Sequence, residues 1–183
     1  MAAPAQTGFT WADLQAFPED GVRREIIGGV LHVSAAPAPR HQRVVLRLGA
    51  RLVAYVDEQG GDVFTGPNTY FGDDDVVEPD LVLLRADHTD RVVGLTVRGP
   101  DLVVELASPS TRRYDLGEKR RLYERMGVPE FWFVDLEVDR VEVYVLDGDS
   151  YADPVLLGRG DPLTSARLSG LTIDVSDALG PAE

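Results

Sequence analysis

The sequence predicts an α/β protein in which a mixed β-sheet is flanked by helices. Short apolar segments with strand character recur along the chain, and segments with helical periodicity lie before and among them. The chain has 183 residues and is 44% hydrophobic, which suits one domain with one substantial core. We therefore expect residues 1–8 to form a flexible tail and residues 9–183 to form a single domain.

The N-terminal region predicts a short helix and then a β-hairpin. The helix is expected at Trp11–Ala16, where a threonine precedes it and a proline follows. Gly28-Gly29 separates two short apolar runs, Arg23–Ile27 and Val30–Ser34. Two glycines between such runs are typical of a tight hairpin turn.

A longer amphipathic helix is expected at Arg40–Val56. Apolar residues recur there at helical spacing and form one stripe: Val44, Val45, Leu48, Leu52 and Tyr55. An adjacent stripe is basic and contains Arg40, Arg43, Arg47 and Arg51. This basic stripe is either a solvated helix face or an edge that contacts phosphates.

The rest of the chain predicts strands around one further helix. The helix is expected at Tyr114–Met126, where Gly127 and Pro129 form a stop signal. The expected strands are Asp80–Leu84, Leu102–Leu106, Phe131–Asp135, Val141–Leu146 and Leu168–Val175. The segment Val63–Tyr70 is a strand candidate with a break in its pattern.

A lysine lies on the apolar face of the helix Tyr114–Met126. At about 100° per residue, Lys119 falls among the apolar side chains, and Asp115 falls beside it one turn earlier. A buried ammonium is costly unless carboxylates meet it. Two purely structural interpretations remain. Lys119 extends to solvent from a partly buried helix, or it forms an ion pair with Asp115 that has no catalytic role.

Two acids near this helix complete a candidate metal site. Glu105 lies in a strand that is apolar on both faces, and Asp80 opens another strand. Neighbouring strands are about 4.8 Å apart, so acids on them can share one cation. Oxygen ligands without cysteine suit Mg²⁺ or Mn²⁺. Taken singly, Asp80 also fits a strand-start residue and Glu105 a solvated edge residue.

Composition excludes several classes of protein and site. There are no cysteines, so disulfides and thiolate–metal sites are excluded. The chain shows no secretory signal and no apolar run near the ~20 residues that a membrane span needs. We therefore expect a soluble, cytoplasmic protein with no membrane partner. The net charge of −13 disfavours non-specific coating of nucleic acid but allows a nuclease with a locally basic cleft.

Several motifs resemble the Uma-two family of restriction endonucleases in the PD-(D/E)XK nuclease superfamily. They are the hairpin Arg24–Val30, the segments Val77–Asp80 and Pro100–Arg112, the residues His41, Asp115, Lys119 and Tyr123, and the segment Gly127–Asp135. The resemblance covers roughly residues 10–175 and is most specific from Glu105 to Asp135. It implies a restriction-endonuclease-like core and Mg²⁺-dependent hydrolysis of DNA phosphodiester bonds.

The resemblance also implies roles for individual residues. Asp80 would be the aspartate of the PD element and Glu105 the acid of the (D/E)XK element, so that both would bind the metal. The position expected to hold the lysine is Ala107, so Lys119 would supply this catalytic group from the next helix. Glu25 would match an additional N-terminal acid, although an exposed hairpin glutamate fits it as well.

Further candidates extend the expected site. His41 begins the basic helix and either reaches the cleft or only starts the helix, and Asp115 accompanies Lys119. Expected phosphate contacts are Arg43, Arg47, Arg112 and Arg113.

Two functions remain open at this point. The first is a Mg²⁺-dependent DNA endonuclease, and symmetry together with two-strand cutting then favours a homodimer. The second is a catalytically inactive nuclease-fold protein that serves as a binding or assembly module.

Overall fold

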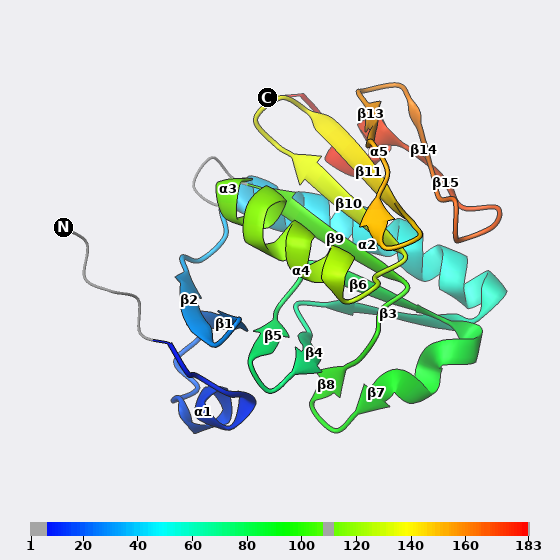
Figure 1. Ribbon diagram of the computed structural model, residues 1–183. Coiled ribbons are helices and arrows are strands. Elements are labelled where there is room, and N and C mark those ends of the chain that lie inside the picture. Colours follow the sequence, from blue (N-terminus) through cyan, green and yellow to red (C-terminus); the bar gives the residue numbers. More distant parts are fainter. Residues whose placement is uncertain (1–6, 108–111, 183) are drawn as a thin grey trace.

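The computed structural model describes residues 7–107 and 112–182 (Figure 1). Its centre is a mixed sheet of seven strands within these ranges. In spatial order they are β12 (Ser150–Tyr151), β11 (Arg140–Asp147), β10 (Glu130–Asp135), β9 (Leu102–Ala107), β6 (Leu81–Arg85) and β3 (Gly61–Thr65), with β13 (Val155–Leu157) also paired to β11. Strands β9 and β10 are parallel, and the other pairs are antiparallel. The predicted fold class is confirmed.

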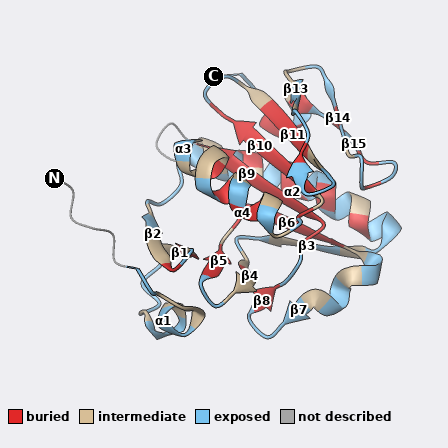
Figure 2. Ribbon diagram, viewed as in Figure 1, coloured by how far each residue is buried: buried red, intermediate tan, exposed pale blue. Residues whose placement is uncertain are grey.

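The central strands are buried on both faces. Every residue of β9 and β10 is buried, as Figure 2 shows for the middle of the sheet. Val104 and Trp132 face a core that helix α2 (Pro39–Gln59) covers, whereas Val103 and Phe133 face a core that helix α4 (Arg120–Arg125) covers. Glu105 has the same parity as Val103 and therefore points toward the α4 side.

Helix α2 follows the predicted amphipathic pattern. Val44, Leu48 and Leu52 are buried, and Val45 and Tyr55 pack against them. The helix is three residues longer at its C-terminus than expected and begins with a proline at its first position, where no hydrogen-bond donor is needed. No helix within the described ranges combines the length and apolarity that crossing a bilayer requires.

A second sheet holds the N-terminal hairpin. Its strands, in spatial order, are β2 (Val30–Ser34), β1 (Arg23–Ile27), β5 (Asp75–Val77), β4 (Asn68–Gly72), β8 (Thr96–Val97) and β7 (Val92–Val93). Gly28 and Gly29 join β1 to β2 with φ values of 57° and 73°, which glycine adopts without strain. The predicted hairpin and the preceding helix α1 (Trp11–Ala16) are both confirmed.

The broken strand candidate Val63–Tyr70 corresponds to two strands. It is divided into β3 and β4, which belong to different sheets. The break falls at Gly66-Pro67, where Gly66 has a φ of 57° and Pro67 has no N–H to donate.

The C-terminal strand is shorter than expected and leads into a helix. Strand β15 (Thr172–Asp174) pairs with β14 (Pro162–Thr164), and helix α5 (Val175–Leu179) follows directly. The side chain of Asp174 accepts a hydrogen bond from the Ser176 N–H at 2.6 Å and so caps this helix. This capping signal was not recognised in the sequence.

The helix expected at Tyr114–Met126 has three consecutive parts. They are α3 (Arg112–Tyr114), a π-helical turn η2 (Asp115–Lys119) and α4. Asp115 and Lys119 are buried with Leu122 and Tyr123, so the lysine does point inward. A 3₁₀ helix, η1 (Ala86–Arg91), follows β6 and was not predicted. Residues 1–6 of the expected tail lie outside the described ranges.

Candidate active site

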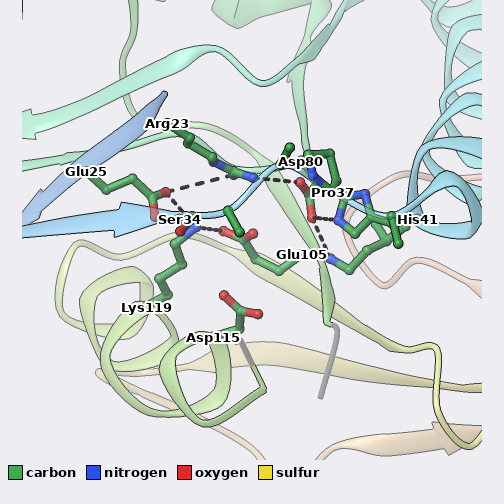
Figure 3. Close-up of a pocket in the computed structure, with 13 residues that line it drawn as sticks. Arg23, Glu25, Ser34, Pro37, His41, Asp80, Glu105, Asp115 and Lys119 are labelled. Carbon is green, nitrogen blue, oxygen red and sulfur yellow. Dashed lines mark hydrogen bonds and ion pairs between the residues drawn. The ribbon is translucent and has the colours of Figure 1, made fainter. Parts of the chain in front are cut away.

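A cavity of about 210 Å³ lies where the hairpin, the start of α2, the turn η2 and the ends of β6 and β9 meet (Figure 3). Its ionisable lining residues are Arg23, Glu25, His41, Asp80, Glu105, Asp115 and Lys119. The cavity thus brings together all six acidic, histidine and lysine residues that the sequence suggested for the site.

Asp80 and Glu105 lie opposite each other on neighbouring strands. The antiparallel register pairs Leu81 with Val104, and one further step in the same register sets Asp80 against Glu105. The backbone N–H of Leu106 donates to Asp80 Oδ2 at 2.8 Å, which fixes this carboxylate at the edge of β9. Two carboxylates therefore converge on one cavity from two strands.

Asp80 is held as an anion by three donors. Arg23 Nη1 lies 3.1 Å from Oδ1, and His41 Nε2 lies 3.0 Å from Oδ2, next to the Leu106 N–H. Burial alone would raise the pKa of Asp80, but the hydrogen bond from His41 and the charge of Arg23 outweigh it and lower the pKa to about 2. The carboxylate is therefore ionised at neutral pH.

Lys119 lies between two buried glutamates. Its Nζ is 2.6 Å from Glu25 Oε1 and 2.9 Å from Glu105 Oε1. Burial disfavours the charge of Lys119, but Glu105 and Glu25 outweigh burial and raise its pKa above the ordinary value. The lysine is therefore a charged ammonium, and it joins the π-helical turn to both the hairpin and the central sheet.

Glu105 has a second donor from the same helix. The hydroxyl of Tyr123 donates to Glu105 Oε1 at 2.5 Å, on the oxygen that Lys119 also contacts. Burial raises the pKa of Glu105 above its ordinary value, and the ammonium of Lys119 reduces this rise without cancelling it. The donors converge on Oε1, so Oε2 is the Glu105 oxygen left for a further ligand among the described contacts.

A sequence comparison identifies the family. The model of the Uma2 family (named Uma-two above), described as "Putative restriction endonuclease", matches residues 11–176. The chain belongs to the Uma2 family. A search of curated protein sequences found no match to this chain.

A solved structure shares the fold of this Uma2 protein. It is a crystal structure from Anabaena variabilis, described as a "putative nuclease belonging to DUF820". The two align with a TM-score of 0.80 and 18% sequence identity, over 94% of this chain and 98% of that one. At this identity the similarity shows the fold alone, and with the N-terminal hairpin it supports the restriction-endonuclease-like core that the sequence predicted.

The lining of the Uma2 cavity suits a divalent cation. Four carboxylates (Glu25, Asp80, Glu105 and Asp115) line it together with only two permanent cations, Arg23 and Lys119. No cluster of three or more histidines, cysteines or acids with metal-binding geometry occurs within the described ranges. Mg²⁺ nevertheless fits, because it is usually held by one or two carboxylates and completes its shell with water and substrate phosphate.

The four arginines expected to contact phosphate are not part of the cavity lining. Arg112 donates to Asp135 Oδ2 at 2.8 Å, and the guanidinium of Arg47 lies next to Gly180 near α5. Arg43 and Arg113 lie on α2 and α3, outside this lining. Their role in phosphate contact stays a prediction about the surface around the cavity.

Sequence reasoning missed two members of the site in this Uma2 protein, Arg23 and the hydroxyl of Tyr123. Arg23 lies two residues before Glu25 in β1, so strand alternation puts both on one face. Tyr123 lies four residues after Lys119, which puts both on one helix face. Both signals were present in the sequence, but neither residue type by itself indicates a metal site.

Proposed function

We propose that this protein is a Mg²⁺-dependent endonuclease that hydrolyses DNA phosphodiester bonds. One observation carries the proposal: the buried ammonium of Lys119 contacts Glu105, and Asp80 stands opposite Glu105 in the same cavity. Two acids on adjacent strands with one lysine form the residue set of the PD-(D/E)XK nucleases that the sequence resembles. The family description supports the same reaction class.

In this proposal Asp80 and Glu105 hold the metal ion. When bound, Mg²⁺ would supply a Lewis acid that polarises the phosphodiester and lowers the pKa of a bound water. Arg23, His41 and the Leu106 N–H keep the Asp80 carboxylate ionised and oriented for this task. Tyr123 orients Glu105 through its hydroxyl.

Lys119 acts in this proposal on the charge of the substrate. A preorganised, buried ammonium stabilises negative charge that develops on phosphate oxygens. Glu25 and Glu105 position the ammonium from two sides. Ala107, on the same strand face as Glu105, is buried in the apolar core, so the lysine is supplied by the helix instead of the strand.

The test is plasmid cleavage by the purified protein with Mg²⁺ and with EDTA. We expect nicked and linear DNA only with Mg²⁺, and at least a hundred-fold loss of rate in Asp80→Asn and in Lys119→Ala, as removal of groups that stabilise transition-state charge typically causes. Asp62→Asn, at an exposed position of β3, is the matched control and should cleave at the wild-type rate. Circular dichroism verifies that each variant is folded.

Undiminished Mg²⁺-dependent cleavage by folded Lys119→Ala would show that the lysine is not catalytic. If the wild type neither cleaves DNA nor binds Mg²⁺ in calorimetry, the inactive binding or assembly module becomes the better description. The net charge of −13 favours that alternative.

Cleavage of both DNA strands would need two sites, so we propose a homodimer as the working assembly. Light scattering coupled to size-exclusion chromatography measures the mass directly. A mass of twice 20.0 kDa is expected, and a mass of one chain would rule the dimer out under those conditions.

A further inference from the structure

A second cavity lies at the other end of the central strands. Its volume is about 410 Å³, and the ionisable residues that line it are Arg85, His88, Arg91, Asp101 and Arg167. Arg85 ends β6 and Asp101 precedes β9, whereas Asp80 and Glu105 lie at the opposite ends of these antiparallel strands. Asp101 and Glu105 are four positions apart in the sequence, or about 13 Å of strand. The two cavities share no lining residue.

The charge of this second cavity is opposite to that of the protein. The chain carries 31 acidic and 18 basic residues, yet three arginines and one histidine line this cavity with a single acid. That acid, Asp101, is buried and already bound: it accepts from the Arg85 N–H at 2.9 Å and from His88 Nδ1 at 2.8 Å. Asp101 therefore holds Arg85 and His88 in position at the wall of the cavity.

Two of the arginines keep their charge uncompensated. Arg91 donates to the carbonyl of Gly99, and Arg167 donates to the carbonyl of Leu146 at 2.6 Å. Neither guanidinium forms an ion pair with a carboxylate within residues 7–107 and 112–182, although the backbone N–H of Arg167 donates to Glu130 Oε2 at 3.2 Å. Arg85 differs, because Asp87 and Asp101 lie 3.3 and 3.4 Å from its nitrogens. Carbonyl partners hold a guanidinium in place without cancelling its charge.

We propose that this second cavity binds a phosphate oxyanion, either inorganic phosphate or the phosphate of a monoester. Guanidinium groups from three segments of the chain converge on it: Arg85 from β6, Arg91 from η1 and Arg167 from the loop before β15. A tetrahedral anion with three terminal oxygens can accept from several guanidinium groups at once, whereas one guanidinium already satisfies a planar carboxylate. The volume exceeds that of one phosphate, which leaves space for the alcohol part of a monoester.

The test is a calorimetric titration with inorganic phosphate, at constant ionic strength and with EDTA so that no metal recruits phosphate to the first cavity. We expect saturable binding, and about ten-fold or greater weakening in Arg167→Ala and in Arg91→Ala, because each removes a charge-assisted hydrogen bond donor. Arg167 is exposed, so its truncation should leave the fold intact. Arg121→Ala, an exposed arginine on α4, is the matched control and should bind like the wild type.

Competition with three further molecules identifies the source of the phosphate. A short oligonucleotide with a 5′-phosphate is compared with the same oligonucleotide ending in a 5′-hydroxyl, and with a nucleoside monophosphate. Competition by the 5′-phosphorylated strand alone supports a DNA end as the ligand, and competition by the monophosphate supports a free small molecule. Absence of saturable phosphate binding, or equal binding by the wild type and both arginine variants, overturns the proposal. These readouts do not depend on nuclease activity.

Discussion

Lys119 connects the π-helical turn to the N-terminal hairpin through Glu25, with 2.6 Å between Nζ and Oε1. Both side chains are buried, and the Glu78 N–H donates to the same carboxylate oxygen at 2.8 Å. The contact therefore joins the π-helical turn to the second sheet through a buried charged pair, and Lys119 reaches the central sheet through Glu105.

Replacing this lysine should destabilise the metal-free protein. Lys119→Met leaves Glu25 and Glu105 buried without their cation, and breaking a buried pair from one side typically costs about 3–5 kcal/mol. Urea unfolding in EDTA measures the free energy of unfolding. The double variant Lys119→Met/Glu25→Gln removes one of the stranded charges and should recover part of the loss. A loss below about 1 kcal/mol in the single variant, the range of a solvated surface pair, would contradict the buried arrangement.

Magnesium should stabilise the folded protein through Asp80. A ligand that binds only the folded state adds about 2.7 kcal/mol at a hundred-fold excess over its dissociation constant. The melting temperature should therefore rise with Mg²⁺ in the wild type and in the control Asp62→Asn, and the rise should disappear in Asp80→Asn. An equal rise in Asp80→Asn would place the ion elsewhere on the protein. Because this measurement needs no DNA, it separates metal binding from catalysis.

Asp139 should make stability depend on pH at the start of α2. It pairs with Arg40 and with Arg159, whose Nε is 2.5 Å from Oδ2. Partial burial alone would raise the pKa of Asp139, but these arginines outweigh it and lower the pKa below the ordinary value. Because the pKa of Asp139 is lower in the folded protein than in the unfolded chain, its ion pairs stabilise the fold fully above about pH 4. This stabilisation is lost as the pH falls through the pKa that Asp139 has in the folded protein.

Asp139→Asn should therefore cost about 1 kcal/mol at pH 7 and progressively less toward pH 2. Asparagine tolerates the φ of 51° at this position, so backbone strain does not confound the comparison. Urea unfolding of both proteins at several pH values measures the difference, with exposed Asp153→Asn as the control. A difference that stays constant between pH 7 and pH 2 would refute the charge-based explanation.

Gly61 should not tolerate a side chain. A Cβ built there would lie 2.3 Å from the carbonyl oxygen of Leu84, and its φ of 120° is unfavourable for other residues. Gly148 has a φ of 62° with open space around it, so Gly148→Ala carries the conformational cost alone, roughly 1–2 kcal/mol. Thermal unfolding should show a clearly larger loss for Gly61→Ala. Equal losses would mean that β3 moves away from β6 at low cost.

The principal strands and the site acids could be predicted because they depend on local pattern. The run around Glu105 is apolar on both faces, which marks a central strand, and helical periodicity placed Lys119 inward. Beyond its N-terminal hairpin, the second sheet could not be predicted, because strands as short as β5, β7 and β8 carry too few residues to show alternation. Arg23 shares a strand face with Glu25, but its contact with Asp80, 57 residues away, depends on how the two sheets pack and could not be predicted.

The π-helical turn has a consequence for insertions and deletions in this chain. A π turn accommodates one more residue than an α-helical turn of the same rise. Deleting one residue from Asp115–Lys119 would restore an α-helix and rotate everything before the deletion by about 100° relative to Tyr123. Asp115 would then rotate away from the cavity while Lys119 stayed in place. The length of the segment Asp115–Lys119, as well as its composition, therefore determines that Asp115 lies beside Lys119 at the cavity.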